Sequence, residues 1–316
     1  MKTPLLVIVG PTAAGKTNTA IEIAAKLSGE VISADSRQIY RYMDIGTAKP
    51  SLAERKGIPH YLIDIVDPDA DFSVANFQPM AQKIINQIWE KGKLPMLVGG
   101  TGLYISAVID AYNFSNLPAN PEFRHQMRKL ALDKGKHYIW HKLQSIDPVT
   151  AERLHPNDVK RIIRALEVYN FTGRTLGSWE QEQPQESPYN LLIIGITRER
   201  SHLYEAINRR VDKMMEMGLI EEVHRLLKMG YSPTLNSMQG LGYKELIPYI
   251  NGEISLAEAV EILKRDTRRF AKRQLTWFRR DKRVNWFVVE SEREADIVEE
   301  ISKLTAGKLN LLANRI

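Results

Sequence analysis

One segment restricts the possible folds of this chain more than any other. Residues 10–17 read GPTAAGKT and match G-x-x-x-x-G-K-[ST], a loop whose backbone N–H groups surround phosphate oxygens. The apolar run before it, residues 5–9, has the composition of a buried parallel strand. Residues 16–27 after it repeat apolar side chains at helical spacing. A chance glycine turn is the weaker interpretation, because this motif belongs between a strand and a helix. The segment therefore predicts an α/β protein built on a parallel sheet.

Strand and helix patterns alternate through the first third of the chain and resume near residue 190. Further strands are predicted at residues 30–34, 60–66, 94–98, 190–197 and 284–289, and further helices at 77–90, 122–133 and 157–170. Turn-rich or polar stretches lie at 113–121 and 177–189. We therefore predict a P-loop NTPase-like parallel sheet flanked by helices, with an inserted all-helical domain. Residues 1–112 and 190–316 form the core, which ends in basic helices, and residues 113–189 form the insert.

Composition excludes several classes of protein. The chain has no cysteine, which rules out a disulfide framework, a thiolate zinc site and a cysteine nucleophile. The apolar run near the N-terminus is too short for a signal peptide, and no stretch is apolar and long enough to span a membrane. We expect a cytoplasmic protein that does not associate with membranes.

The positive charge is concentrated in one segment. The chain carries a formal net charge of +6, yet residues 264–283 alone contain ten Lys or Arg and only two Asp. The rest of the chain is therefore slightly acidic. Such an excess is typical of a contact with a polyanion, although a solvated helix face is an equally good interpretation of charge alone.

The phosphate loop indicates the class of ligand but not the reaction. Lys16 supplies a full positive charge, and the Thr17 hydroxyl is placed to hold Mg²⁺. The helix that begins here adds partial positive charge. The whole loop is thus a candidate site for a di- or triphosphate: Gly10, Pro11, Thr12, Ala13, Ala14, Gly15, Lys16 and Thr17. Most proteins with this loop are kinases or nucleoside triphosphatases.

Two further segments end predicted strands. Asp35, in SADSRQ, could act as a general base beside the phosphate loop, or could form an Asx turn or helix N-cap. The strand 94–98 runs into Gly99-Gly100-Thr101-Gly102, where an ATPase would have an acidic Walker B residue. These glycines permit close approach of the backbone, although a tight turn alone would also explain them. The missing acid weakens the ATPase interpretation.

Together these segments resemble one family. GPTAAGKT, SADSRQIY (33–40) and VGGTGLY (98–104) occur together in tRNA dimethylallyltransferases, also called tRNA isopentenyltransferases. Later segments are similar too: PEFR (121–124), HPNDVKRIIRALEVY (155–169), MQGLGYKEL (238–246) and KRQLTWFRR (272–280). The resemblance covers nearly the whole chain, and kinases share only the first of these motifs.

The resemblance implies a reaction and a catalytic set. The family transfers a dimethylallyl group from dimethylallyl diphosphate to N6 of the adenosine 3′ of the anticodon, position 37 of the tRNA. By resemblance the catalytic residues would be Asp35 as the general base, with Thr12, Thr101 and Arg210. The loop would hold the diphosphate, Arg210 would bind it, and Mg²⁺ would be the cofactor. The adjacent Arg209 is the obvious alternative to Arg210.

The resemblance also implies a surface for the tRNA anticodon stem-loop. Its expected residues are Asp35, Ser36, Arg37, Gln38, Thr101, Arg124, Arg164, Gln239, Gly242, Tyr243, Lys244, Lys272, Arg273, Gln274, Trp277 and Arg279. The insert would be a tRNA-binding domain. For the aromatic residues of the basic segment, packing in the core is the alternative to stacking on bases. We expect a monomer.

Other functions would also explain parts of the sequence. A small-molecule or nucleotide kinase accounts for the loop and Asp35, but not for the basic segment or the insert. A prenyltransferase acting on free adenylate is a further alternative. An RNA-binding protein without activity would not need the intact Lys16, Thr17 and Asp35.

Overall fold

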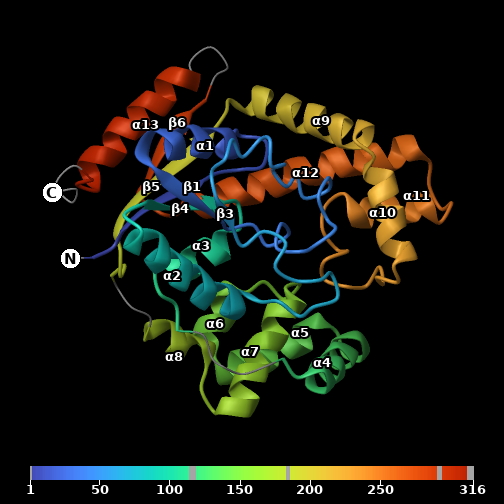
Figure 1. Ribbon diagram of the computed structural model, residues 1–316. Coiled ribbons are helices and arrows are strands. Elements are labelled where there is room, and N and C mark those ends of the chain that lie inside the picture. Colours follow the sequence, from blue (N-terminus) through green and yellow to red (C-terminus); the bar gives the residue numbers. More distant parts are fainter. Residues whose placement is uncertain (1, 114–118, 183–185, 290–293, 312–316) are drawn as a thin grey trace. The chain divides into compact units, whose positions relative to one another are not determined.

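The chain folds into two compact units. The computed structural model describes residues 2–113, 119–182, 186–289 and 294–311 (Figure 1). The first unit, here called the core unit, comprises Met1–Ile109 and Ser187–Ile316. The second, the helical unit, comprises Asp110–Glu186. The insert was predicted at residues 113–189, of which 114–118 and 183–185 lie outside the described residues.

A six-stranded sheet forms the centre of the core unit, and every pairing in it is parallel. The strand order is β3-β2-β4-β1-β5-β6. The strands are β1 (Pro4–Val9), β2 (Gly29–Ser33), β3 (His60–Tyr61), β4 (Leu94–Gly99), β5 (Asn190–Thr197) and β6 (Val284–Val288). The fold class predicted from the sequence is confirmed as a parallel sheet flanked by helices, and similar solved structures support it below.

One predicted strand is much shorter than expected. The run 60–66 is a strand only at His60–Tyr61. Leu62 and Asp64 both have positive φ angles, of 60° and 57°, which an extended strand cannot contain. The chain therefore turns, and Val66 makes only an isolated bridge to Tyr40.

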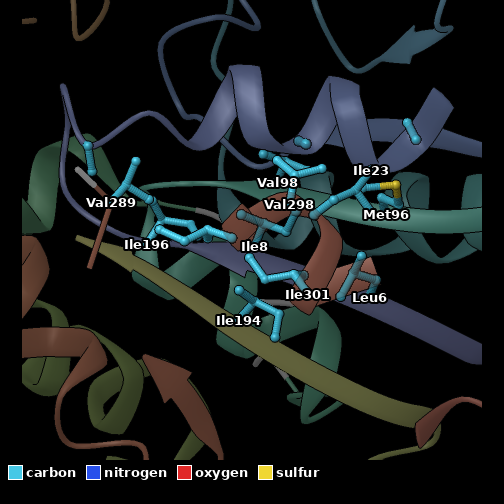
Figure 2. Packing of buried hydrophobic residues seen from close by; sticks show 14 of the residues in the cluster. Leu6, Ile8, Ile23, Met96, Val98, Ile194, Ile196, Val289, Val298 and Ile301 are labelled. Atoms are coloured by element: carbon cyan, nitrogen blue, oxygen red, sulfur yellow. The ribbon is translucent and has the colours of Figure 1, made fainter. Parts of the chain in front are cut away.

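Helices cover both faces of the sheet, which explains why its strands read as continuous apolar runs. On one face Leu6 and Ile8 of β1 pack with residues of α1 (Lys16–Leu27), α9 (Arg200–Glu216) and α13 (Glu294–Lys308). Figure 2 shows this packing, with Ile301 of α13 among the strand side chains. On the other face the alternate residues Leu5 and Val7 pack against α2 (Val74–Glu90) and α3 (Gly102–Ile109). Figure 1 shows these two helices on the side of the sheet away from α1.

A third cluster in the core unit joins the segment after β2 to a group of later helices. These are α9, α10 (Leu219–Lys228), α11 (Tyr243–Ile250) and α12 (Leu256–Phe278). The buried Glu222 carboxylate accepts hydrogen bonds from the N–H groups of Asp44, Ile45 and Gly46 and from the Tyr243 hydroxyl. One carboxylate thereby attaches the 44–46 loop to α10 and α11.

The helical unit has its own core. It contains α4 (Pro121–Asp133), α5 (Lys136–Ile146), α6 (Pro148–Arg153), α7 (Val159–Thr172) and α8 (Leu176–Gln181). The expectation of a loop at 177–189 was wrong for its first residues, which lie in α8. Thr175 begins this helix by accepting from Ser178 N, and Asp147 accepts from Gly177 N at 3.0 Å. These contacts compensate for the weak helical pattern of the segment.

Among the residues that the structure describes, no helix combines the length and the apolar character needed to cross a membrane.

Candidate functional site

The carboxyl ends of all six strands lie at one edge of the sheet, because every pair is parallel. The phosphate loop follows β1, Asp35 follows β2 and Thr101 follows β4. Arg198 directly follows β5. The topology alone therefore brings these four segments to one side of the core unit.

The phosphate loop has a conformation that depends on its glycines. Gly10 has a φ of 148°, and a Cβ there would lie 2.1 Å from the Ile196 carbonyl oxygen of β5. Gly15 has a φ of 104°, which also favours glycine. The Lys16 ammonium donates to the Pro11 carbonyl at 2.7 Å, across the loop. The motif residues thus form a compact loop directly before α1.

Gln274 of α12 connects the phosphate loop to the turn after β4. Its Oε1 accepts from Thr12 N at 2.8 Å, and its Nε2 donates to the Gly100 carbonyl at 2.9 Å. The side chain is buried, and a Cβ on Gly100 would meet it at 2.2 Å. The sequence predicted Gln274 as a tRNA contact; its amide bonds two backbone groups of the site, and the tRNA contact stays a prediction.

Asp35 and Thr101 lie in two turns that are hydrogen-bonded to each other. Ser36 N donates to Thr101 Oγ1 at 3.0 Å, and Thr101 N donates to the Ala34 carbonyl at 3.2 Å. Asp35 Oδ1 accepts from Arg37 N at 2.9 Å, which forms the Asx turn considered above. The turn interpretation is therefore correct, and it leaves Asp35 beside a cavity as well.

Two cavities meet at this edge of the sheet. The smaller, of about 260 Å³, is lined by phosphate-loop residues together with Asn18, Arg198, Ala206 and Arg210. The larger, of about 280 Å³, is lined by Thr12, Asp35, Ser36, Arg37, Thr101, Arg210, Gln239, Gly242, Tyr243, Lys244 and Arg273, among others. Arg210 of α9 lines both. Arg209, the alternative to it, lines neither and lies 3.5 Å from Glu205 at the surface.

The electrostatics of the site are dominated by buried cations. Burial and, to a smaller extent, the Arg210 guanidinium lower the pKa of Lys16 to about 7, although the Asp35 carboxylate opposes the fall. Burial also lowers the pKa of Arg210, again against the attraction of Asp35. Burial raises the pKa of the Tyr104 hydroxyl well above its usual value, so that it stays protonated. Two crowded positive charges next to one carboxylate suit an anionic ligand.

Some residues expected to bind tRNA lie outside the larger cavity. Gln38 accepts from the Ser33 hydroxyl at 2.9 Å and supports the strand end. Trp277 is partly exposed, and its ring lies so close to Gly102 that a Cβ on this glycine would clash with it. Lys272 and Arg279 are exposed on and after α12. The assignments of these residues to tRNA stay predictions.

The basic segment 264–283 divides into a paired and an unpaired part. Lys264 pairs with Asp212, Arg265 and Arg269 pair with Asp266, and Arg268 donates to Asn208. Four later cations make no ion pair or side-chain hydrogen bond with any described residue: Lys272, Arg279, Arg280 and Lys282. Arg273 lies over the Phe270 ring at 5.7 Å and lines the larger cavity. The free positive charge is therefore concentrated at residues 272–282.

The aromatic residues of this segment differ in burial, so core packing applies to some of them and exposure to a ligand applies to others. Phe278 is buried and packs in the core. Phe270 lines the larger cavity, and Trp277 is 38% exposed.

In the helical unit, Arg124 and Arg164 share one partner. Both donate to the Glu167 carboxylate, which is fully buried. Burial opposes ionisation of Glu167, but the hydrogen bonds from Arg124, Asn120 N–H and Arg164 prevail and lower its pKa. The two arginines thus stabilise the fold of this unit, and their contact with tRNA stays a prediction.

The residues are compatible with Mg²⁺. The exposed Thr17 hydroxyl lies at the start of α1 and lines the smaller cavity. The described residues contain no cluster of three acidic, His or Cys side chains. None is needed, because Mg²⁺ beside a phosphate loop takes most of its ligands from phosphate oxygens and water.

Sequence reasoning missed Arg198. A signal was available, because it directly follows the predicted strand 190–197 and the carboxyl ends of parallel strands share one edge.

Comparison with known proteins gives one consistent family. The family model described as "IPP transferase" matches residues 38–281. The tRNA dimethylallyltransferase of Pelotomaculum thermopropionicum is 52% identical over 310 residues, which cover 98% of each chain. That of Acetivibrio thermocellus is 53% identical over 300 residues, which cover 95% of each.

Similar solved structures come from the same family as these similar sequences. The full-length tRNA isopentenylpyrophosphate transferase of Bacillus halodurans is similar with a TM-score of 0.74 and 47% identity, over 98% of this chain and 97% of that one. A eukaryotic dimethylallyltransferase, described as acting on tRNA, has a TM-score of 0.83 and 26% identity, over 99% of this chain and 80% of that one.

Proposed function

Because this chain belongs to the IPP transferase family, we propose that it is a tRNA-prenylating enzyme whose two cavities hold the two substrates. It transfers the dimethylallyl group of dimethylallyl diphosphate to N6 of the adenosine 3′ of the anticodon in tRNA. The products are N6-isopentenyladenosine in the tRNA and pyrophosphate. The observation that carries this arrangement is Arg210, which lines the phosphate-loop cavity and the Asp35 cavity at once.

The smaller cavity suits the diphosphate. The loop backbone and Lys16 face it, and the start of α1 adds partial positive charge. A bound diphosphate would reverse the unfavourable proximity of Lys16 and Arg210, because each cation would then face an anion. These groups stabilise the negative charge that grows on pyrophosphate as the allylic C–O bond breaks.

The larger cavity suits the acceptor and the prenyl chain. Asp35 and Thr101 come from turns at the strand ends, while Val211, Met214 and Leu263 give the cavity an apolar part. An adenine must leave its stack to enter such a space. As N6 attacks C1 of the prenyl group, the N–C bond forms, the C–O bond breaks, and the Asp35 carboxylate takes the N6 proton.

Thr17 would hold Mg²⁺ together with the diphosphate oxygens. The ion would supply further charge for the leaving group. Thr17 lies at the start of α1 and lines the smaller cavity, which Asp35 does not line.

The surface that follows the larger cavity supports tRNA as the acceptor. Arg273 lines that cavity, and the unpaired Lys272, Arg279, Arg280 and Lys282 continue from it along the chain. Free positive charge near an acceptor site favours a polyanionic substrate over free adenylate. Because tRNA is the substrate, we propose that the protein acts in the cytoplasm.

The decisive experiment contains no ATP. Purified protein, Mg²⁺, radiolabelled dimethylallyl diphosphate and an unmodified tRNA with adenosines after the anticodon are incubated together. We expect label on the adenosine at position 37 of the tRNA. A tRNA with guanosine at that position is the control and should remain unlabelled. Transfer only to free adenylate, or phosphorylation only when ATP is added, would contradict the proposal.

A further inference from the structure

Arg198 reaches over the phosphate loop from the neighbouring strand. It follows Thr197, the last residue of β5, and Nη2 of its guanidinium lies 3.7 Å from the position that a Cβ would take on Gly15. The sheet fixes its backbone relative to the loop, because Val9 of β1 pairs with Gly195 of β5. Arg198 therefore stands beside the loop in a defined position and lines the smaller cavity.

The guanidinium of Arg198 has no partner among the residues that the structure describes. Its Nε is buried without a hydrogen bond, and in the described part of the chain the side chain forms no ion pair. Two neighbouring cations do have partners: Lys16 donates to the Pro11 carbonyl, and Arg200 lies over the Tyr204 ring at 5.3 Å. A buried N–H without an acceptor is unfavourable, so such a group in a native protein calls for an explanation, and an anionic ligand in the adjoining cavity would supply the acceptor.

The smaller cavity has three cationic side chains, Lys16, Arg198 and Arg210, and no carboxylate among the residues that line it. A diphosphate ester carries up to three negative charges, so its charge matches this set. Arg210 also lines the larger cavity, whereas Arg198 lines only the smaller one, which Asp35 does not line. In a bound diphosphate, the phosphate next to the reacting carbon would therefore lie nearer Arg210, and the terminal phosphate would lie nearer Arg198.

We propose that Arg198 binds the terminal phosphate of the prenyl diphosphate and of the pyrophosphate product. This inference rests on the proposed function of the site. A guanidinium presents two parallel N–H donors to phosphate oxygens, and such charge-assisted pairs are the strongest hydrogen bonds in proteins. Arg198 thereby stabilises the leaving group while Asp35 acts at the opposite end of the reacting atoms.

The test compares Arg198→Met and Arg198→Lys with Arg200→Met as the matched control. Binding of magnesium pyrophosphate is measured by calorimetry, and KM is measured for each substrate. Arg198→Met should weaken pyrophosphate binding by about tenfold to a hundredfold and raise KM for dimethylallyl diphosphate to a similar degree. KM for tRNA should change by less than about twofold. Arg198→Lys should be intermediate, and Arg200→Met should resemble the wild type.

Thermal melting separates this role from a merely structural one. Met removes a buried unsatisfied N–H, so the free Arg198→Met protein should melt no lower than the wild type. Pyrophosphate should raise Tm less in the variant, because the rise depends on affinity. If Arg198 only supported the loop, the free variant would melt lower.

Other results would overturn either the role of Arg198 or the proposed function. Wild-type pyrophosphate affinity in folded Arg198→Met overturns the inference, as does a rise in KM for tRNA alone. If the variant does not fold, wild-type affinity in Arg198→Lys overturns it equally. Should the wild type fail to prenylate tRNA while Arg198→Met still loses pyrophosphate, the proposed function fails and the role of Arg198 stands.

Discussion

The two oxygens of Asp35 have different surroundings. Oδ1 accepts from Arg37 N and so maintains the turn after β2. Oδ2 makes no hydrogen bond with the residues that the structure describes, and the side chain lines the larger cavity. One carboxylate can therefore shape the backbone and also accept a proton from a substrate.

Asparagine separates these two roles. In Asp35→Asn the amide oxygen can still accept from Arg37 N, but the basic carboxylate is lost. We expect kcat to fall by about 10²–10⁴-fold while tRNA affinity stays close to the wild type. Single-turnover rates and filter binding measure the two. Asp35→Ala, which also loses the turn, should weaken tRNA binding as well. A normal single-turnover rate in the Asn variant would exclude Asp35 as the base.

Lys16 makes diphosphate binding depend on pH. Burial and Arg210 lower its pKa to about 7, so much of the free protein carries a neutral Lys16 above that pH. An anion raises the pKa again, so binding above pH 7 should take up a proton, and affinity should fall as pH increases. Calorimetry of pyrophosphate binding at pH 8 in buffers of different ionisation enthalpy measures the uptake. In Lys16→Arg, whose guanidinium stays charged, uptake should be smaller. Equal uptake in both proteins would refute this.

Among the elements, α12 contributes most to the geometry of the site. Through Gln274 it connects the phosphate loop to the turn after β4, beyond the last paired residues of β1 and β4. Gln274→Leu leaves Thr12 N and the Gly100 carbonyl without their partner, at a cost of about 1–3 kcal/mol in the free energy of unfolding. Chemical denaturation measures this loss.

We also expect a kinetic effect of Gln274→Leu. Because the loop loses an attachment, KM for dimethylallyl diphosphate should rise more than KM for tRNA. Gln274→Glu is the matched control: it can still accept from Thr12 N but cannot donate to the Gly100 carbonyl. An effect on KM for tRNA alone would contradict this role and would support the direct tRNA contact predicted from the sequence.

Elements with strong local signals could be predicted from the sequence. The helix at Lys16–Leu27 and the strand at Asn190–Thr197 have the predicted bounds, since periodicity and the adjacent glycine loop agree. The prediction of a strand at 60–66 was wrong, because the apolar pattern does not reveal the positive φ angles at Leu62 and Asp64. Helix α8 was missed since its start depends on Asp147, far earlier in the chain.

The same division applies to the candidate site. Asp35 and Thr101 were predicted because both end strands of a parallel sheet. The partners of Gln274 could not be predicted, since Thr12 and Gly100 are more than 170 residues away. Nor did charge alone show that Arg124 and Arg164 converge on one buried carboxylate.

For the whole molecule, the distribution of unpaired charge predicts how salt affects tRNA binding. Lys272→Ala combined with Arg273→Ala removes two cations that have no acidic partner among the described residues. The slope of log K against log salt should become shallower by about 0.7 to 0.9 per lost phosphate contact. Arg265→Ala with Arg269→Ala is the control, because both pair with Asp266, and its slope should change less. Equal slopes in the two double variants would contradict this surface.

The points where the chain leaves and re-enters the core unit are joined. The Ser187 hydroxyl donates to the Ile109 carbonyl at 2.5 Å, so the two ends of the helical unit's segment meet within the core unit itself. A segment whose ends meet can be lengthened, shortened or exchanged without moving the strands on either side. The helical unit is therefore a module on which selection can act separately: substitutions and changes in length can accumulate in it while the residues at the strand ends are preserved.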